Sequence, residues 1–403
     1  MLALVNGKLL TMTHGTIDGG TVLIDGGKIV AVGRDVTIPQ GCKTVDCQGK
    51  YVLPGLIDAN GMVGLHNDGF GSIGHDEDEK FTPVAPQLRA IDAIWPEDPA
   101  LADCVKAGIT AVSVGPATTG VITGQCAVIK TRGGAIDDMV VKAPAGLRIS
   151  ITGTPRSPWG NTGVTPRDRS TDIALLRQEL RRAKEAIEKQ EKAAAKADAG
   201  DAAGGPDRNL KQEVLIALLK GELPARVNVR YSYDIDNALE LAREWGFKLI
   251  LEDAPDAQLM VGDIAKAGAP VIVGPLPVNK EGERKNLSLK TPGILAKAGV
   301  KVAIASGFPE TPIRYLFVSA ALACSEGMPE DDALKAITIN AAEILGVADR
   351  IGSLDAGKDA DIVVYDGHPF EITSRVDRVY MDGELVAGGC CADAAHGCCK
   401  EGK

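Results

Sequence analysis

The segment from His66 to Glu79 is dense in side chains that bind metals, with two histidines and five carboxylates. Imidazole and carboxylate groups suit Zn, Mn or Fe, so His66, His75 and Asp76 form a candidate metal site. Their spacing matches neither an i, i+4 helical pair nor a Cys-x-x-Cys motif. We therefore favour an acidic, solvated loop with two incidental histidines, and we keep the metal site as the alternative.

The end of the sequence holds a second group of metal-binding side chains. Four cysteines and one histidine stand close together, at Cys390, Cys391, His396, Cys398 and Cys399. Thiolate and imidazole ligands could bind Zn or Cu(I), or transfer a metal. Adjacent cysteines do not match the spacing of structural zinc sites. A disordered, redox-sensitive tail over residues 388–403, or one that crosslinks subunits, is therefore equally open.

The bulk composition limits the classes of function. The 403 residues, of which 45% are apolar, are enough for a barrel of roughly 250 residues and a smaller domain. A net charge of −10 and an aromatic content of 4% argue against nucleic-acid binding. No run approaches the roughly 18 apolar residues of a membrane span, and the first residues lack the basic start of a secretory signal. We therefore expect a cytoplasmic protein that binds neither nucleic acid nor membrane.

Both ends of the sequence read as short strands with tight turns, whereas the middle alternates between strands and helices. Residues 1–53 and 350–387 share Asn-Gly or Asp-Gly turn signals and predict one composite β-sandwich domain. Residues 54–349 predict a (β/α)8 barrel, an α/β fold, with an open doubly wound sheet as the alternative. The eight expected barrel strands are Leu56–Asp58, Thr110–Val114, Ala127–Lys130, Leu147–Ile151, Arg226–Arg230, Lys248–Leu251, Pro270–Val273 and Lys301–Ala305.

Residues 172–220 interrupt this alternation. A long charged helix is expected from Asp172 to Ala197, followed by a Gly-rich hinge and a second helix that ends near Lys220. The favoured interpretation is a solvated helical hairpin on the rim of the barrel. The alternative is a lid or an oligomer contact.

Three motifs, in their order and spacing, resemble the amidohydrolase superfamily and, within it, the imidazolonepropionase-like branch. The first is Val52-Leu-Pro-Gly-Leu-Ile-Asp-Ala59, an apolar strand, a Pro-Gly turn and a second strand. The second is the helix at 336–346, which usually closes the barrel, and the third is residues 351–364, which return the chain to the β-domain. The resemblance covers Leu2 to about Val386 and implies a (β/α)8 barrel with a small β-sandwich.

The resemblance also implies where metal ligands stand, and this chain departs from the family at each of those positions. Active members place His-x-His on strand one, a carboxylate or modified lysine on strand four, a histidine on each of strands five and six, and an aspartate on strand eight. An amide oxygen binds divalent metals weakly and a thioether is soft, so the residues found here do not replace those ligands. The corresponding positions are Asn60, Met62, Gly153, Asn228, Asp253 and Gly307.

Polar residues near the predicted strand ends are candidates for the pocket. Lys130 follows strand three, where it could bind an anion or form a rim salt bridge. Arg230 and Tyr231 follow strand five, and Glu252 and Asp253 end strand six. We expect Arg230 to pair with Glu252 and Asp253 and to fill the former metal cavity, so that Arg230→Ala would destabilise the fold.

The leading hypothesis is an amidohydrolase-fold protein without the family's metal ligands, which acts as a non-catalytic structural, regulatory or ligand-binding subunit. No cofactor is expected in the barrel. Such a chain would form a homo-oligomer, or a hetero-oligomer with a paralogue, and could bind a small molecule. The first alternative is an active hydrolase of non-peptide C–N bonds that uses zinc or another divalent metal at an unconventional site. The second alternative is a metal-binding protein that acts through the Cys-rich tail.

Overall fold

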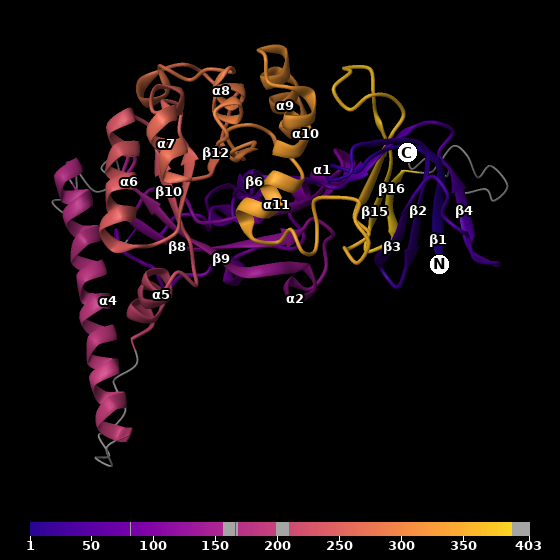
Figure 1. Cartoon of the computed structure of the whole chain (residues 1–403). Coiled ribbons are helices and arrows are strands. Elements are labelled where there is room, and N and C mark those ends of the chain that lie inside the picture. Colours follow the sequence, from indigo (N-terminus) through magenta and orange to yellow (C-terminus); the bar gives the residue numbers. More distant parts are fainter. Residues whose placement is uncertain (81, 156–165, 167, 199–208, 389–403) are drawn as a thin grey trace.

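The computed structural model describes residues 1–80, 82–155, 166, 168–198 and 209–388. This part of the chain contains two eight-stranded sheets, which lie side by side, and helices that surround the second sheet (Figure 1). The first sheet combines strands from both ends of the chain, and the second sheet forms the barrel. The predicted fold class, a barrel with a β-sandwich built from both ends, is thereby confirmed.

The first sheet runs in the order β16-β15-β14-β5-β1-β2-β3, and β4 also pairs with β1. The antiparallel pair of β14 and β5, with Ile362 opposite Pro54, connects the C-terminal strands to the N-terminal strands. Apolar side chains from both ends, including Leu4, Val22 and Ile362, share one buried core. The strands are β1 (Leu2–Leu10), β2 (Thr16–Asp25), β3 (Lys28–Gly33), β4 (Lys43–Asp46), β5 (Tyr51–Pro54), β14 (Ile362–Tyr365), β15 (Val376–Met381) and β16 (Glu384–Gly388).

The barrel sheet contains all eight strands expected from the sequence, and seven of them are parallel. The third strand, β8, is antiparallel to both of its neighbours. It follows β7 through a short connection without a helix, and such a connection can join only antiparallel strands. The expectation of eight strand–helix alternations is therefore wrong at this point. The strands are β6 (Leu56–Gly61), β7 (Ile109–Val114), β8 (Ile122–Lys130), β9 (Val140–Ser150), β10 (Ala225–Val229), β11 (Leu249–Asp253), β12 (Val271–Val273) and β13 (Val302–Ile304).

The barrel closes between its last strand and its first. The backbone N–H of Gly307 donates to the Asn60 carbonyl at 3.2 Å, and that of Met62 donates to the Phe308 carbonyl at 3.1 Å. Both contacts lie where the parallel strands end. The closed ring therefore brings the strand-one and strand-eight motif positions together.

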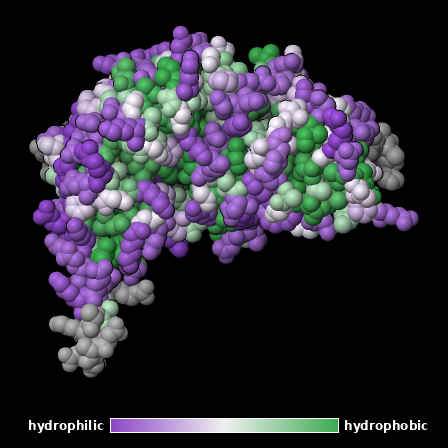
Figure 2. All heavy atoms as spheres, viewed as in Figure 1, coloured by the Kyte–Doolittle hydropathy of each residue, from purple (hydrophilic) through white to green (hydrophobic). Residues whose placement is uncertain are grey.

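Most helices pack on the outside of the barrel, whereas the far end of α4 projects away from it (Figure 1). The first half of α4 buries Leu176, Leu180 and Ala183, and hydrophilic side chains cover its projecting part (Figure 2). No helix in the described ranges is both long enough and apolar enough to cross a membrane. The helices are α1 (Pro99–Lys106), α2 (Ile136–Met139), α4 (Arg169–Asp198), α5 (Leu210–Leu219), α6 (Ser232–Trp245), α7 (Val261–Ala267), α8 (Thr291–Lys297), α9 (Leu316–Ser325), α10 (Glu330–Ala336) and α11 (Ile339–Leu345), with 3-10 turns η1 (Asp68–Gly74), η2 (Ala90–Asp92), η3 (Ala257–Leu259), η4 (Gly282–Arg284) and η5 (Ile313–Tyr315).

Candidate functional site

A small pocket of about 50 Å³ lies where the parallel barrel strands end. This is the end at which barrels of this kind carry their active sites. Gly153 is absent from the wall of the pocket, and its N–H donates to Glu283 Oε1 at 2.8 Å. The wall contains the other five positions at which the family resemblance implies ligands, namely Asn60, Met62, Asn228, Asp253 and Gly307.

Arg148, on β9, occupies the space beside Asn60. Its Nη2 donates to Asn60 Oδ1, and its Nη1 donates to the Pro116 carbonyl at 2.7 Å. The Arg148 side chain is only 3% exposed, so its charge is held within the barrel. The amide oxygen that a metal would need is therefore already bound to a cation.

Glu252, on β11, balances two arginines in the interior of the barrel. Arg226 Nε donates to Glu252 Oε1, and Arg148 Nε lies 3.4 Å from Glu252 Oε2. Arg226 also donates to Ser113 Oγ and, at 2.8 Å, to the Ala59 carbonyl. Desolvation lowers the pKa of the fully buried Arg226, but the attraction and hydrogen bond of Glu252, together with nearby groups such as Asp58, outweigh it and raise the pKa overall. Arg226 therefore keeps its charge in the interior of the barrel.

Asp58 connects the first strand to the segment after the last one. Its carboxylate accepts hydrogen bonds from Ser306 N at 3.1 Å, from Asn60 N at 3.2 Å and from Ser306 Oγ. Burial raises the pKa of Asp58 to about 6, although these hydrogen bonds lower it. Ser306 thus serves to hold Asp58, and the carboxylate that this segment does bring to the pocket wall, Glu310, is paired with Arg284.

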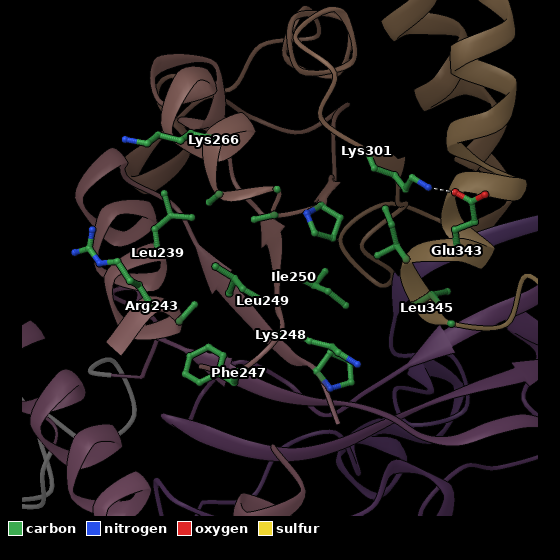
Figure 3. A pocket seen from close by; sticks show the side chains of 18 of the residues that line it. Leu239, Arg243, Phe247, Lys248, Leu249, Ile250, Lys266, Lys301, Glu343 and Leu345 are labelled. Atoms are coloured by element: carbon green, nitrogen blue, oxygen red, sulfur yellow. Dashed lines mark hydrogen bonds and ion pairs between the residues drawn. The ribbon is translucent and has the colours of Figure 1, made fainter. Parts of the chain in front are cut away.

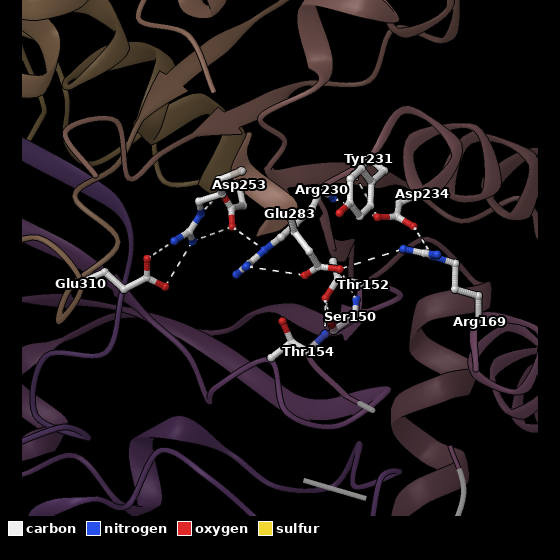
Figure 4. Close-up of polar contacts among 12 residues, drawn as sticks. Ser150, Thr152, Thr154, Arg169, Arg230, Tyr231, Asp234, Asp253, Glu283 and Glu310 are labelled. Atoms are coloured by element: carbon white, nitrogen blue, oxygen red, sulfur yellow. Dashed lines mark hydrogen bonds and ion pairs between the residues drawn. The ribbon is translucent and has the colours of Figure 1, made fainter. Parts of the chain in front are cut away.

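A second ion-pair network surrounds the mouth of the pocket (Figure 4). Arg230 Nε lies 3.1 Å from Asp253 Oδ2, and Arg284 Nη2 donates to the same oxygen at 2.8 Å. Arg284 also donates to Glu310 Oε1 at 3.1 Å. Arg230 therefore pairs with Asp253 as expected, but not with Glu252. The reason is the backbone of β11: alternation directs Glu252 into the barrel together with Ile250, whereas Asp253, at φ +67°, leaves the extended conformation and reaches the mouth.

Tyr231 lies outside the wall of the pocket, contrary to the expectation from its position. Its ring stacks on Tyr233 with 5.0 Å between centroids, and the Arg169 guanidinium lies over both rings. The Asp234 carboxylate accepts from the backbone N–H groups of Tyr231 at 2.9 Å and Arg230 at 3.2 Å. This cap fixes the start of α6 and the backbone at Arg230.

Lys130 lies at the opposite end of the barrel, which corrects the expectation that it lines the pocket. Because β8 is antiparallel, its last residue, Lys130, pairs with Ala111 near the start of β7. Its Nζ lies 3.0 Å from Asp359 Oδ2 and 3.1 Å from Asp361 Oδ1, and it also contacts Asp382. Lys130 therefore joins the barrel to the β-domain.

The loop after β6 brings together His66, His75 and Glu77. In the described part of the chain, this is the one group of three such side chains whose ligand atoms all lie within 4.8 Å of one another. Asp76, which was expected in this site, is exposed and stands between His75 and Glu77, so alternation directs it to the other side. The tail candidates Cys390, Cys391, His396, Cys398 and Cys399 lie outside the described residues.

Sequence reasoning missed Arg148, Arg226 and Asp58, which occupy the interior of the barrel. Their signal is a period of two among polar residues: Arg148, Ser150 and Thr152 alternate with apolar residues, as do Arg226 and Asn228. In a barrel strand, one set of alternate residues faces the interior. A run of polar residues at this period therefore predicts a polar interior.

A larger groove, of about 1120 Å³, lies at the other end of the barrel strands (Figure 3). Lys248 and Lys301, which precede β11 and β13, line it together with Arg243 of α6. Its charged side chains include both signs, as in the ion pair between Lys301 and Glu343. No histidine or cysteine lies among its lining residues, and within the described residues its carboxylates form no group of three close ligand atoms.

Comparison with known proteins places this architecture in a family. The model of the amidohydrolase family matches residues 293–386. The chain is 23% identical to amidohydrolase tasK of Hapsidospora irregularis over 391 residues, which cover 90% of this chain and 39% of that protein. It is 26% identical to imidazolonepropionase of Acidiphilium cryptum (strain JF-5) over 368 residues, which cover 87% and 88% of the two chains.

A solved structure gives stronger support. The amidohydrolase from Thermotoga maritima MSB8 superimposes with a TM-score of 0.92 and is 34% identical, over 96% of this chain and 100% of that chain. Identity at this level over whole chains goes beyond a shared fold. The chain therefore belongs to the amidohydrolase family and is similar to imidazolonepropionases.

Proposed function

We propose that this chain is a non-catalytic member of the amidohydrolase family that serves as a structural or regulatory subunit. The observation that carries the proposal is the hydrogen bond from Arg148 to Asn60 Oδ1. A guanidinium at this point repels a divalent cation and occupies the acceptor that the cation would need. The conventional metal centre of the family therefore does not fit the residues of this barrel.

The other donors around the pocket support the same proposal. Met62 offers a thioether, Gly307 offers no side chain, and Asp253 is already paired with Arg230 and Arg284. Hard or borderline divalent metals prefer imidazole and unpaired carboxylate ligands. Among the residues that the structure describes, the wall of the pocket thus offers no set of ligands that could activate a water molecule.

The size of the pocket favours a structural or regulatory role over the binding of a substrate-sized ligand. Ligand pockets usually enclose roughly 300–1,000 Å³, whereas this pocket encloses about 50 Å³. A few water molecules or a small ion would fill it. We propose that the chain works in an oligomer, either with copies of itself or with an active paralogue.

Turnover and assembly test this proposal together. The full chain, supplied in turn with Zn²⁺, Mn²⁺ and Co²⁺, is assayed on cyclic amides and ureas, with the Acidiphilium cryptum imidazolonepropionase as the positive control. We expect no turnover above the protein-free background, and an oligomer in analytical ultracentrifugation. Saturable turnover that a chelator abolishes would overturn the non-catalytic role, and a monomer would overturn the role as a subunit.

The second candidate function is hydrolysis at an unconventional metal site. It is favoured by one observation, the approach of His66, His75 and Glu77 to one another beside the barrel mouth. Turnover that disappears in Glu77→Gln but persists in Arg230→Ala would establish this alternative.

A further inference from the structure

The approach of His66, His75 and Glu77 has the geometry of a metal site before the metal binds. His66 Nδ1 lies 3.0 Å from Glu77 Oε1, and His75 Nδ1 lies 3.7 Å from the same oxygen. In a tetrahedral zinc site with bonds of 2.0–2.2 Å, two ligand atoms stand about 3.4 Å apart. Small rotations of these side chains would therefore bring all three to bonding distance.

The backbone of the loop holds the two histidines in register. His66 and His75 form an antiparallel bridge, and their rings lie 4.3 Å apart between centroids. The N–H of Asn67 donates to Gly74 O at 2.7 Å, and that of Asp76 donates to Leu65 O at 2.9 Å. The loop thus fixes the relative position of the ligands. It is already ordered before a metal ion binds.

The carboxylate of Glu77 is mostly buried, and one of its oxygens lacks a partner in the part of the chain that the structure describes. Its side chain is 12% exposed, and within the described residues its Oε2 is buried without a hydrogen-bond partner. A buried carboxylate oxygen normally has a partner, because burial without one is costly. A cation that this carboxylate binds through both of its oxygens would supply a partner for Oε2.

We propose that His66, His75 and Glu77 bind one divalent cation, with zinc preferred, at the rim of the barrel. Two imidazoles and one carboxylate suit zinc, and three protein ligands leave a fourth position open. His75 is 40% exposed, so this position can be reached from solvent. The site is new relative to the conventional centre, which the resemblance places at Asn60 and Met62.

The proposed site is close to the pocket but separate from it. The His66 ring meets the edge of the Phe308 ring at 6.3 Å between centroids, and Phe308 belongs to the wall of the pocket. The N–H of His66 donates to the Met62 carbonyl at 2.9 Å. An ion at this site would therefore be anchored to the end of the first barrel strand without entering the arginine-rich pocket.

Titration of Zn²⁺ into the full chain tests the proposal. The tail is first silenced by four Cys→Ser substitutions at positions 390, 391, 398 and 399 and by His396→Ala, so that it cannot compete. Calorimetry should show one Zn²⁺ per chain. With Co²⁺, the absorption spectrum should show ligand-field bands without a thiolate charge-transfer band.

Single substitutions assign the ligands. His75→Ala and Glu77→Gln should each weaken Zn²⁺ binding by more than the roughly 10- to 100-fold typical of an outer-shell partner. The matched controls are His14→Ala, which removes another histidine that contacts a carboxylate, and Asp76→Asn, which removes the neighbouring carboxylate. Both controls should bind Zn²⁺ as the parent does.

Two results would overturn the proposal. The first is no Zn²⁺ binding in the tail-silenced chain, and the second is a Zn²⁺ affinity of His75→Ala and Glu77→Gln equal to that of the tail-silenced parent. Because 40% of the His75 side chain is exposed, its loss should leave the fold intact, which circular dichroism checks. Turnover measured in the same samples keeps the two proposals apart. Zn²⁺ binding without turnover supports both the metal site and the non-catalytic role. Turnover that requires Glu77 overturns only the non-catalytic role.

Discussion

Asp58 is a carboxyl group that the barrel holds away from water, and burial raises its pKa to about 6. Between about pH 4 and pH 6 the folded chain keeps this proton, whereas the unfolded chain has released it. The native state therefore binds more protons, and stability falls as the pH rises through this window. A shift of about two pKa units corresponds to about 3 kcal/mol.

Asp58→Asn should remove this pH dependence. An amide cannot ionise, and its oxygen can still accept from the Ser306 and Asn60 N–H groups. The difference in unfolding free energy between variant and parent should move by about 3 kcal/mol in favour of the variant from pH 4 to pH 7. Urea unfolding at several pH values measures it. Asp76→Asn, at an exposed position, is the control, and a constant difference would contradict the role of Asp58.

Glu252 is the only carboxylate that either Arg148 or Arg226 is seen to pair with in the described residues. Glu252→Gln keeps the shape but leaves two buried guanidinium groups without a counter-charge, which should cost about 3–5 kcal/mol. Arg230→Ala should cost less, about 1–2 kcal/mol, because Arg284 still pairs with Asp253 after the change. Urea unfolding at pH 7 compares them. Equal losses of unfolding free energy in the two variants would contradict the larger contribution that we expect from the interior ion pairs.

Among single residues, the sequence predicts the place in the site only of those that belong to a recognisable motif. Asn60 and Met62 follow directly from the strand-one motif, and they do lie in the pocket wall. The partner of Asn60 could not be predicted, because Arg148 is 88 positions away and only the closed barrel brings it close. The sequence predicts Asp76 as the carboxylate beside the two histidines, whereas the structure places Glu77 there, because sequence alone does not give the direction of alternation in the loop.

At the scale of elements, the loop between β6 and η1 decides whether the proposed metal ligands meet. Asn67 begins η1, and its Oδ1 accepts from the Gly69 N–H at 3.0 Å. Such a cap contributes about 1 kcal/mol. The loop conformation, and with it the bridge between His66 and His75, should depend on this side chain.

Asn67→Ala should therefore weaken Zn²⁺ binding without removing a ligand. A loss of about 1 kcal/mol of loop order corresponds to a roughly fivefold weaker affinity. Calorimetry on the tail-silenced chain measures the affinity, and hydrogen exchange at the Asp76 N–H reports the order of the loop. Faster exchange with unchanged affinity would show that the loop does not preorganise the site.

The direction of β8 is the element-scale feature that the sequence did not reveal. Its apolar residues predict a strand correctly, but the local pattern is the same for parallel and antiparallel strands. The signal was the short connection from Val114 to Ile122, which leaves no room for a crossover helix. This single reversal moves Lys130 from the pocket to the opposite end of the barrel.

At the scale of the whole molecule, Lys130 holds the barrel against the β-domain. Its side chain is 5% exposed and lies among Asp359 and Asp361, which are almost fully buried, and Asp382. Asp359 also pairs with Lys28 and Arg350. Burial raises the pKa of Asp361 to about 6, and the charge of Lys130 counteracts this rise. The ionised form of Asp361 therefore depends most on the charge of Lys130.

Lys130→Met should destabilise the chain, and more so at high pH. Without the ammonium group the pKa of Asp361 rises further, so the folded state binds a proton that the unfolded state releases and stability falls as the pH rises. The cost should reach about 3–5 kcal/mol at pH 8 and be smaller at pH 5, where Asp361 is largely protonated. Arg132→Met removes an exposed ion pair with Glu384 at the same junction and should cost less than about 1 kcal/mol at both pH values. Urea unfolding of both variants at pH 5 and pH 8 checks this. A cost for Lys130→Met that does not grow with pH would mean that Asp361 is not the group Lys130 holds in its charged form.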